Sequence, residues 1–278
     1  MRVRRTSIIR AAVLTSVLTG CATAVPPVPF AAPSASPTPV VDRLHFAVAS
    51  DFHYGEPGTD YQAGFAQAVA GLNAADAADP LAFVALNGDI SHGGVGLAQQ
   101  AKVALAGLRP RLLVTPGNHD ELTGAEWQQV WGAPADQVVR FGDRSVILAS
   151  TSNAAGDYLC PNQQWLAEAL AGEARQRDVF VIFHITVKKW TKHGIDCPQT
   201  RALLAGTSNV RAVFNGHDHD QVSVKDDDGV SYFFDGHVGG SWGAPERTYR
   251  DVLVTDAGLS TRLLTLDGRE LARDVLTW

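Results

Sequence analysis

Short apolar runs alternate with polar, glycine-containing turns and with amphipathic stretches from about residue 44 onward. Runs rich in β-branched and aromatic residues that end at turn residues predict strands. In the first half of the chain they cover 44–49, 81–86 and 111–114. Apolar residues at helical spacing predict helices over 61–75 and 96–108. This alternation of strands and helices is typical of an α/β domain.

The second half of the chain repeats this pattern less regularly. A strand is predicted over 145–148, a helix over 162–175 and a fully buried strand over 179–183. From residue 210 strand signals dominate, at 210–214, 221–224, 230–234, 249–255 and 260–266. Charged turns separate these strands, which predicts a second, largely antiparallel sheet. No internal repeat and no linker follows residue 43, so we expect one folded domain over 43–278.

The first 20 residues follow a different pattern. Four arginines precede a short apolar stretch over 11–18, which is too short to span a bilayer and predicts a signal peptide over 1–20. The stretch ends in Leu18-Thr19-Gly20-Cys21, which resembles a bacterial lipobox. That resemblance implies that Cys21 carries a lipid and becomes the mature N-terminus, anchored in the bacterial cell envelope. The alternative is an ordinary cleaved signal.

The segment over 21–42 is predicted to be an extended tether. Six of the fourteen prolines lie here, and residues 25–39 carry no charge. Beyond it only Cys160 and Cys197 remain, an even number in an oxidising compartment, so we expect a disulfide between them. Two unpaired buried thiols are the alternative. Neither cysteine has a C-x-x-C partner, which disfavours a cysteine zinc site.

Composition and charge narrow the possible ligands. The chain has 278 residues, 45% of them hydrophobic, which is enough to bury a sizeable core. Its formal net charge is −6, and the first 20 residues hold four arginines and no acid, so the remainder is more acidic still. Such a chain is repelled by nucleic acid and gains nothing from anionic lipid headgroups. A phosphate-bearing ligand therefore needs a local positive centre that these side chains do not supply.

Side chains able to bind metals follow the predicted strands. They are Asp51 and His53, then Asp89, then Asn118, His119 and Asp120, and later His184, His217 and His219. In open α/β sheets ligands bind at the carboxyl ends of the strands. The sequence therefore predicts that these residues meet at one metal-binding site.

These residues form five short motifs: D-x-H at 51–53, G-D at 88–89, G-N-H-D at 117–120, a single histidine at 184 and G-H-x-H at 216–219. The set resembles the calcineurin-like metallophosphoesterase superfamily, with all five motifs in order. The resemblance implies an α/β fold, a four-layer αββα sandwich of two mixed β-sheets flanked by helices. It also implies an enzyme that depends on two divalent metal ions, either Mn, Fe or Zn, whose identity the ligand types leave open.

The resemblance further implies roles for individual residues. One metal would be held by Asp51, His53, Asp89 and His219, and the other by Asp89, Asn118, His184 and His217. A metal-bridging hydroxide would attack phosphorus, and His119 would protonate the leaving oxygen while Asp120 orients its ring. Two divalent ions would bring more positive charge than the two aspartates remove, and would supply the local positive centre that the composition lacks.

The sequence departs from the family pattern at two places. His92 stands where many relatives have an aspartate, and Thr186 where they often have a proline. After His184 come basic and aromatic residues, Lys188, Lys189, Trp190 and His193, which we expect to form a substrate-recognition loop that the disulfide holds in place. A solvated charged loop is the alternative. Trp242 is either a second wall of the pocket or a packing residue.

We therefore expect a lipid-anchored phosphoric ester hydrolase with a small phosphate ester as its substrate. A phosphodiesterase is favoured, because Gln164-Trp165-Leu166 resembles the cyclic-nucleotide and glycerophosphodiester branch. The alternatives are a phosphomonoesterase or nucleotidase on the same site, or a non-catalytic envelope binding protein that retains the fold. The membrane is expected as a partner only through the anchor, nucleic acid is not expected, and no protein partner follows from the sequence.

Overall fold

The computed structural model describes residues 42–278. The predicted signal peptide, the lipidation site Cys21 and nearly all of the tether lie outside these residues. Among the residues that the structure does describe, no helix is long and apolar enough to cross a bilayer.

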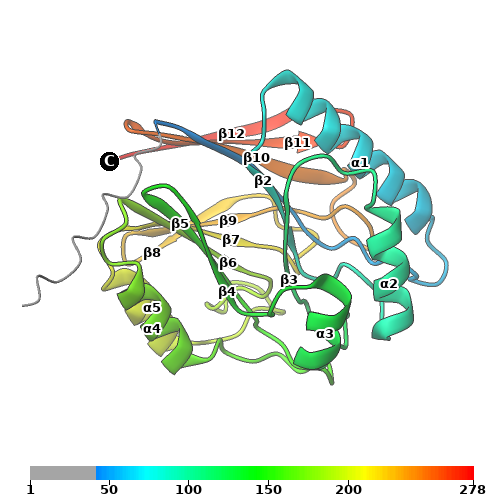
Figure 1. The fold of residues 1–278 in the computed structure, drawn as a ribbon, viewed down its shortest axis with the longest axis horizontal. Helices are drawn as coiled ribbons and strands as arrows, with labels where there is room; N and C mark the ends of the chain where they lie inside the picture. Colours follow the sequence, from blue (N-terminus) through cyan, green and yellow to red (C-terminus); the bar gives the residue numbers. More distant parts are fainter. Residues whose placement is uncertain (1–41) are drawn as a thin grey trace, which may run out of the picture. The chain divides into compact units, whose positions relative to one another are not determined.

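The first of two six-stranded sheets combines strands from the two ends of the domain (Figure 1). Its order is β12 (Glu270–Thr277), β11 (Gly258–Thr265), β10 (Thr248–Thr255), β1 (Leu44–Ala49), β2 (Phe83–Asn87) and β3 (Leu112–Thr115). β1, β2 and β3 are parallel, whereas β10, β11 and β12 form an antiparallel meander that joins at β1.

The second sheet has a parallel centre with an antiparallel strand at each edge. Its order is β4 (Gln137–Phe141), β5 (Arg144–Ala149), β6 (Asp178–Phe183), β7 (Val210–Asn215), β9 (Val230–Phe234) and β8 (Val224–Asp227). Neighbours from β5 to β9 are parallel, and β4 and β8 pair antiparallel with their neighbours. β5, β6 and β9 are buried along their whole length, as expected for parallel strands covered on both faces.

Apolar side chains hold four layers together. Alternate residues of β1 point to opposite faces, so Phe46 packs between the two sheets while Ala47 faces the helices. The outer face of the first sheet is covered by α1 (Tyr61–Ala78), α2 (Gly94–Ala104) and α3 (Gly124–Trp131). The outer face of the second is covered by α4 (Gln163–Gly172) and α5 (Pro198–Ala205). This confirms the expected four-layer αββα sandwich.

The strands after residue 210 do not form the separate antiparallel sheet that their pattern predicted. β7 and β9 extend the parallel part of the second sheet, and β10 to β12 extend the first. The strand at 221–224 begins only at Val224. β4, β12, α3 and α5 were not predicted; β12 is an edge strand of exposed and partly buried residues, so it lacks an apolar run. For α3 a signal exists, a capping box between Thr123 and Glu126.

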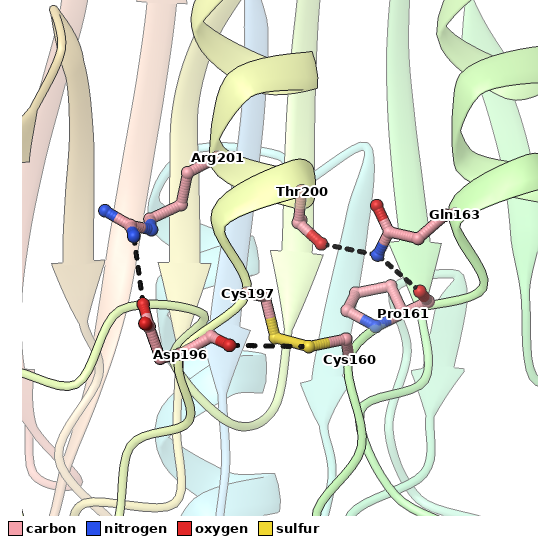
Figure 2. The surroundings of a disulfide bond; sticks show 7 residues. All are labelled: Cys160, Pro161, Gln163, Asp196, Cys197, Thr200 and Arg201. Carbon is pink, nitrogen blue, oxygen red and sulfur yellow. Dashed lines mark hydrogen bonds and ion pairs between the residues drawn. A yellow bond between two sulfur atoms is a disulfide. The ribbon is translucent and has the colours of Figure 1, made fainter.

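The predicted disulfide is confirmed. Cys160 and Cys197 are bonded, with their Cα atoms 5.7 Å apart (Figure 2). The bond joins the loop before α4 to the residue that caps α5. Beside it, the Gln163 amide donates hydrogen bonds to Thr200 Oγ1 at 2.7 Å and to the Pro161 carbonyl at 2.8 Å. The disulfide therefore fixes one end of the segment 184–197, which starts at His184.

Candidate metal centre

Six motif residues are brought together where β1, β2, β6 and β7 end, and all are buried. They are Asp51, His53, Asp89, His184, His217 and His219. Asn118, which follows β3, is also buried beside them. Because each motif directly follows a strand, the shared edge of the parallel strands places side chains from distant parts of the chain at one point.

The backbone is strained at this edge. Asp51, His53, Asp89 and His217 have positive φ angles of 58°, 50°, 49° and 66°. For residues with a Cβ atom this left-handed conformation costs roughly 1–3 kcal/mol each. The Asp51 amide donates to the Gly88 carbonyl at 3.1 Å and the His53 amide to the Asp89 carbonyl at 2.8 Å, so hydrogen bonds between neighbouring strand ends hold the conformation. Strain concentrated in this way is typical of functional sites.

The first ligand group consists of Asp51, His53 and His219. The Nε2 atoms of the two histidines lie 3.1 Å apart, and His219 Nε2 lies 3.1 Å from Asp51 Oδ1. The Nδ1 atom of His219 donates a hydrogen bond to the Trp242 carbonyl at 3.0 Å. In the neutral ring this leaves the Nε2 lone pair directed at the other two ligands, the arrangement typical of a metal-binding histidine.

The second ligand group consists of Asp89, His184 and His217. His184 Nε2 lies 3.2 Å from Asp89 Oδ2, while its Nδ1 atom donates to the Asn87 carbonyl at 2.7 Å. His217 Nε2 and Asn118 Oδ1 are buried and find no hydrogen-bond partner among residues 42–278. Buried polar atoms are almost always hydrogen-bonded, so these two atoms require another partner. A cation between the three ligands would provide it.

Asp89 lies between the two groups. Its Oδ2 atom is 3.7 Å from His53 Nε2 and 3.2 Å from His184 Nε2. Its Oδ1 atom accepts a hydrogen bond from the His119 amide at 2.8 Å. This position is the one expected of a carboxylate that bridges two cations.

The pKa values of these groups are strongly shifted in the metal-free protein. Burial opposes ionisation of the carboxyl groups, but the neighbouring imidazoles hold the pKa of Asp51 and of Asp89 well below the usual range. Burial disfavours the charged imidazole of His184, yet Asp89 and Asp51 raise its pKa to about 10. Burial lowers the pKa of His53 to about 4 and that of His217 to about 3.

The donor set therefore fits two divalent cations. His53 and His217 are neutral at physiological pH and can bind metal directly, whereas His184 has to lose a proton first. Nitrogen and carboxylate oxygen donors of this kind suit Mn, Fe or Zn.

Comparison with known proteins agrees with this geometry. A model of the family described as calcineurin-like phosphoesterase matches residues 44–221, well over half of the chain. The chain belongs to the calcineurin-like phosphoesterase family. The match contains every proposed metal ligand, because the last of them is His219, and it ends before Trp242.

Solved structures share the fold at low sequence identity. A dimetal phosphatase from Danio rerio is 12% identical and has a TM-score of 0.69, covering 84% of this chain and 98% of its own. GAP50, the anchor in the inner membrane complex of Plasmodium, is 11% identical with a TM-score of 0.62, covering 85% and 89%. The calcineurin-like phosphoesterase YfkN from Bacillus subtilis is 11% identical with a TM-score of 0.52, covering 84% and 93%. No curated protein sequence was found to match the chain.

In this phosphoesterase His119 lies at the rim of the centre, but Asp120 does not orient it as expected. The His119 ring meets His53 edge-on, with ring centroids 5.1 Å apart. The Asp120 carboxylate instead accepts hydrogen bonds from the Ser91 amide and hydroxyl, at 2.8 and 3.0 Å, and from the Gly117 amide at 2.8 Å. Burial raises the pKa of Asp120 to about 7. Asp120 thus shapes the loop that carries the ligands.

His92, which departs from the family pattern, contacts both His53 and His119. Its Nδ1 atom lies 3.1 Å from Nδ1 of His53, whose Nε2 atom points to the first ligand group. Its ring is stacked on that of His119, with centroids 4.7 Å apart and an angle of 12° between the planes. The sequence marks this position as a departure from the family pattern, and the structure places the His92 ring against both His53, a candidate metal ligand, and His119.

The four residues of the predicted substrate loop have different surroundings. Lys188 forms an ion pair with Asp227 and lies 5.2 Å from the ring of Trp190, which packs edge-on against Tyr232. These contacts tie both side chains to the second sheet. Lys189 is exposed. Only His193 reaches the centre, with its ring centroid 5.9 Å from that of His217.

Three aromatic residues at the centre were not assigned a site role from the sequence. Trp242, which the sequence left as either a pocket wall or a packing residue, stacks on the ring of His219. The ring of His237 also stacks on that of His219. Tyr158 stands edge-on to His217, with centroids 4.8 Å apart. The signal that could have found Trp242 is a large aromatic residue within the glycine-rich run 239–243.

Proposed function

We propose that this phosphoesterase is a dimetal-dependent phosphoric ester hydrolase that acts chiefly on phosphodiesters. The observation that carries the proposal is the pair of ligand groups that share Asp89, with His217 Nε2 and Asn118 Oδ1 buried and without a hydrogen bond. Every ion-pair partner of Asp51 and Asp89 is a histidine. Their charge is therefore available to cations.

The chain's own residues supply the remaining parts of the mechanism. Two divalent ions, when bound, would provide the positive charge that the phosphate and an attacking water need. Asp89 would be fixed by the His119 amide and Asp51 by the His217 amide, which donates to it at 2.9 Å. His119 would donate a proton to the leaving oxygen at the rim, with its ring plane held by the stacked His92.

The charge distribution favours a diester over a monoester. Lys188, a basic residue of the expected substrate-recognition loop, is paired with Asp227. A phosphodiester carries a single negative charge, whereas a monoester at neutral pH carries nearly two and gains more from additional basic groups. A phosphomonoesterase or nucleotidase remains the second candidate, because the same ligand groups would hold either phosphate.

Hydrolysis of bis-p-nitrophenyl phosphate and p-nitrophenyl phosphate with added Mn²⁺ or Zn²⁺ tests the proposal. We expect metal-dependent turnover that is faster on the diester and that is lost in Asp89→Asn and His119→Ala. The matched control is Asp228→Asn in the exposed turn between β8 and β9, where asparagine tolerates the positive φ of 47°. Bound metal without turnover of either ester would instead support a binding protein that retains the fold.

The proposal includes a lipid anchor at Cys21. It is supported by the arginine-rich start, the short apolar stretch and the sequence Leu18-Thr19-Gly20-Cys21. A labelled fatty acid should be incorporated into the wild-type chain expressed in bacteria and should be absent from Cys21→Ser. Equal labelling of both proteins, or of neither, would remove the anchor from the proposal and leave the hydrolase untouched.

A further inference from the structure

Three aromatic rings form a parallel stack beside the first ligand group. The His237 ring lies 5.0 Å from that of His219, with 7° between their planes, and the His219 ring lies 4.3 Å from that of Trp242, with 3° between them. The metal ligand is therefore the middle layer. The outer layer is Trp242, whose side chain is 43% exposed. The metal centre uses only the backbone carbonyl of Trp242, as the acceptor from His219, so the exposed part of the indole has no role in holding metal.

The position of Trp242 is built into the backbone. A Cβ atom on Gly240 would approach His219 Cε1 to 2.6 Å, and one on Gly243 would approach His219 Cβ to 2.5 Å. Both glycines also have positive φ angles, of 86° and 124°. Only glycine on both sides lets this segment lie against the ligand. The indole is thus held at the metal centre by the fold.

Other rings continue around the mouth of the centre. The His193 ring lies 5.4 Å from that of Trp242 and 5.9 Å from that of His217, and so lies between Trp242 and the second ligand group. Tyr158, 41% exposed, meets the His217 ring edge-on, with centroids 4.8 Å apart. Large exposed apolar side chains that gather at a polar site commonly mark a binding surface. A phosphate held at the metal centre would place its ester groups among these rings.

We propose that Trp242 is a stacking subsite for a planar aromatic group, such as a nucleobase, on the ester that the metal centre hydrolyses. The inference rests on the proposed function and concerns substrate selection within it. A flat ring on the open indole face would become the fourth layer of the stack, an arrangement that aromatic groups favour. A glycerol or other alkyl ester has no planar face and gains little there. Trp242 lies beyond the region that matches the family, so this subsite belongs to the chain's own C-terminal part.

A pair of substrates that differ only in the base tests the subsite. The methyl ester of adenosine 5′-phosphate is compared with the same ester of 1-O-methylribose 5-phosphate, and methanol release gives kcat/KM for each with Mn²⁺ or Zn²⁺. We expect the wild type to prefer the adenosine ester roughly tenfold, since stacking a base on an aromatic side chain commonly contributes a factor of about five to a hundred. Trp242→Ala should bring the ratio of the two kcat/KM values close to one, and Trp242→Phe should retain most of it.

Trp278→Ala is the matched control, because Trp278 is also an exposed tryptophan and contacts Arg211 near the start of β7, whereas the metal centre lies at the end of that strand. It should keep the wild-type ratio. A wild-type ratio near one, or an equal loss on both esters in Trp242→Ala, overturns the subsite even when bis-p-nitrophenyl phosphate is hydrolysed. Failure of metal-loaded protein to hydrolyse any of these esters overturns the proposed function itself.

Discussion

The second sheet buries charged and polar groups at both of its ends, but in opposite ways. At the amino end, Arg144 Nε donates to Asp178 Oδ2 at 3.0 Å, and Arg211 Nε donates to Asp178 Oδ1 at 2.8 Å. Arg144 and Asp178 are fully buried, and each meets a group of opposite charge. At the carboxyl end, His184 and His217 are also buried, yet His217 Nε2 has no hydrogen-bond partner within the described residues 42–278.

This difference separates a structural ion network from a site. Burial and charge are common to both ends of the sheet, so neither property alone identifies function. What distinguishes the carboxyl end is a set of ligand atoms that converge on each other and leave lone pairs without donors. The backbone agrees, because the positive φ angles of Asp51, His53, Asp89 and His217 all lie at the carboxyl ends of strands. Four experiments test how far the two ends differ.

The largest effect is expected on activity when a ligand without a partner is removed. His217→Ala should lower metal-dependent kcat/KM by more than about a hundredfold, because even residues that only support metal ligands commonly contribute ten- to a hundredfold. The melting temperature of the metal-free protein should change little, since no hydrogen bond to His217 Nε2 is lost. Assays with metal excess and calorimetry of chelated protein measure the two quantities. A variant that keeps its activity would show that His217 binds no metal.

The reverse result is expected at the amino end. Asp178→Asn removes the buried carboxylate that pairs with Arg144 and Arg211, and breaking a buried ion pair commonly lowers the free energy of unfolding by about 3–5 kcal/mol. The melting temperature should fall by roughly 10 °C, while kcat per folded molecule is retained. Denaturant unfolding and assays well below the melting temperature measure this. Loss of kcat in a fully folded variant would contradict the distinction drawn between the two ends.

Metal removal should destabilise the protein in a manner that depends on pH. Binding at a hundred times the dissociation constant stabilises a protein by about 2.7 kcal/mol. In the metal-free protein the pKa of His184 is raised from 6.5 to about 10, so its pairing with Asp89 stabilises the fold fully below pH 6.5 and is lost as the pH rises towards 10. Metal also competes better as that proton leaves. The difference in melting temperature between metal-loaded and chelated protein should therefore grow from pH 6 to pH 8.5. If the difference in melting temperature shrinks from pH 6 to pH 8.5, the proton that competes with metal is not the one on His184.

The smallest effect is expected for the residue that supports a ligand. His92→Ala removes the contact with His53 Nδ1 and the stack on His119, and we expect about a tenfold loss of metal affinity or of kcat/KM. His92→Asn restores a polar partner for His53 without a ring, so it should recover metal affinity better than it recovers kcat. Metal titrations followed by steady-state assays separate the two. Equal recovery of both would mean that the stack on His119 contributes nothing.

The set of candidate metal ligands could be predicted from the sequence because their residue types, order and place after strands are all local properties. The disulfide followed from a count of two cysteines. The role of Asp120 could not, since only the loop conformation determines whether its carboxylate faces its neighbour's ring or the amides of Ser91 and Gly117. Lys188 forms an ion pair with Asp227 on β8, and the sequence of the loop alone does not reveal this partner. Five of the six strands after residue 210 were predicted, but their pairing was not, because β-strand partners are chosen by tertiary packing.

The pairing of β1 bears on how the protein is made. β1 is hydrogen-bonded to β10, with Leu44 opposite Val254, so the first strand of the domain depends on one synthesised about two hundred residues later. Contacts so distant in sequence slow folding, because a long loop must close before they form. A chain that emerges amino end first therefore holds Asp51 and His53 in position only after its last strands have appeared. The capacity to bind metal should arise at the very end of biosynthesis, after export is complete if the chain is exported.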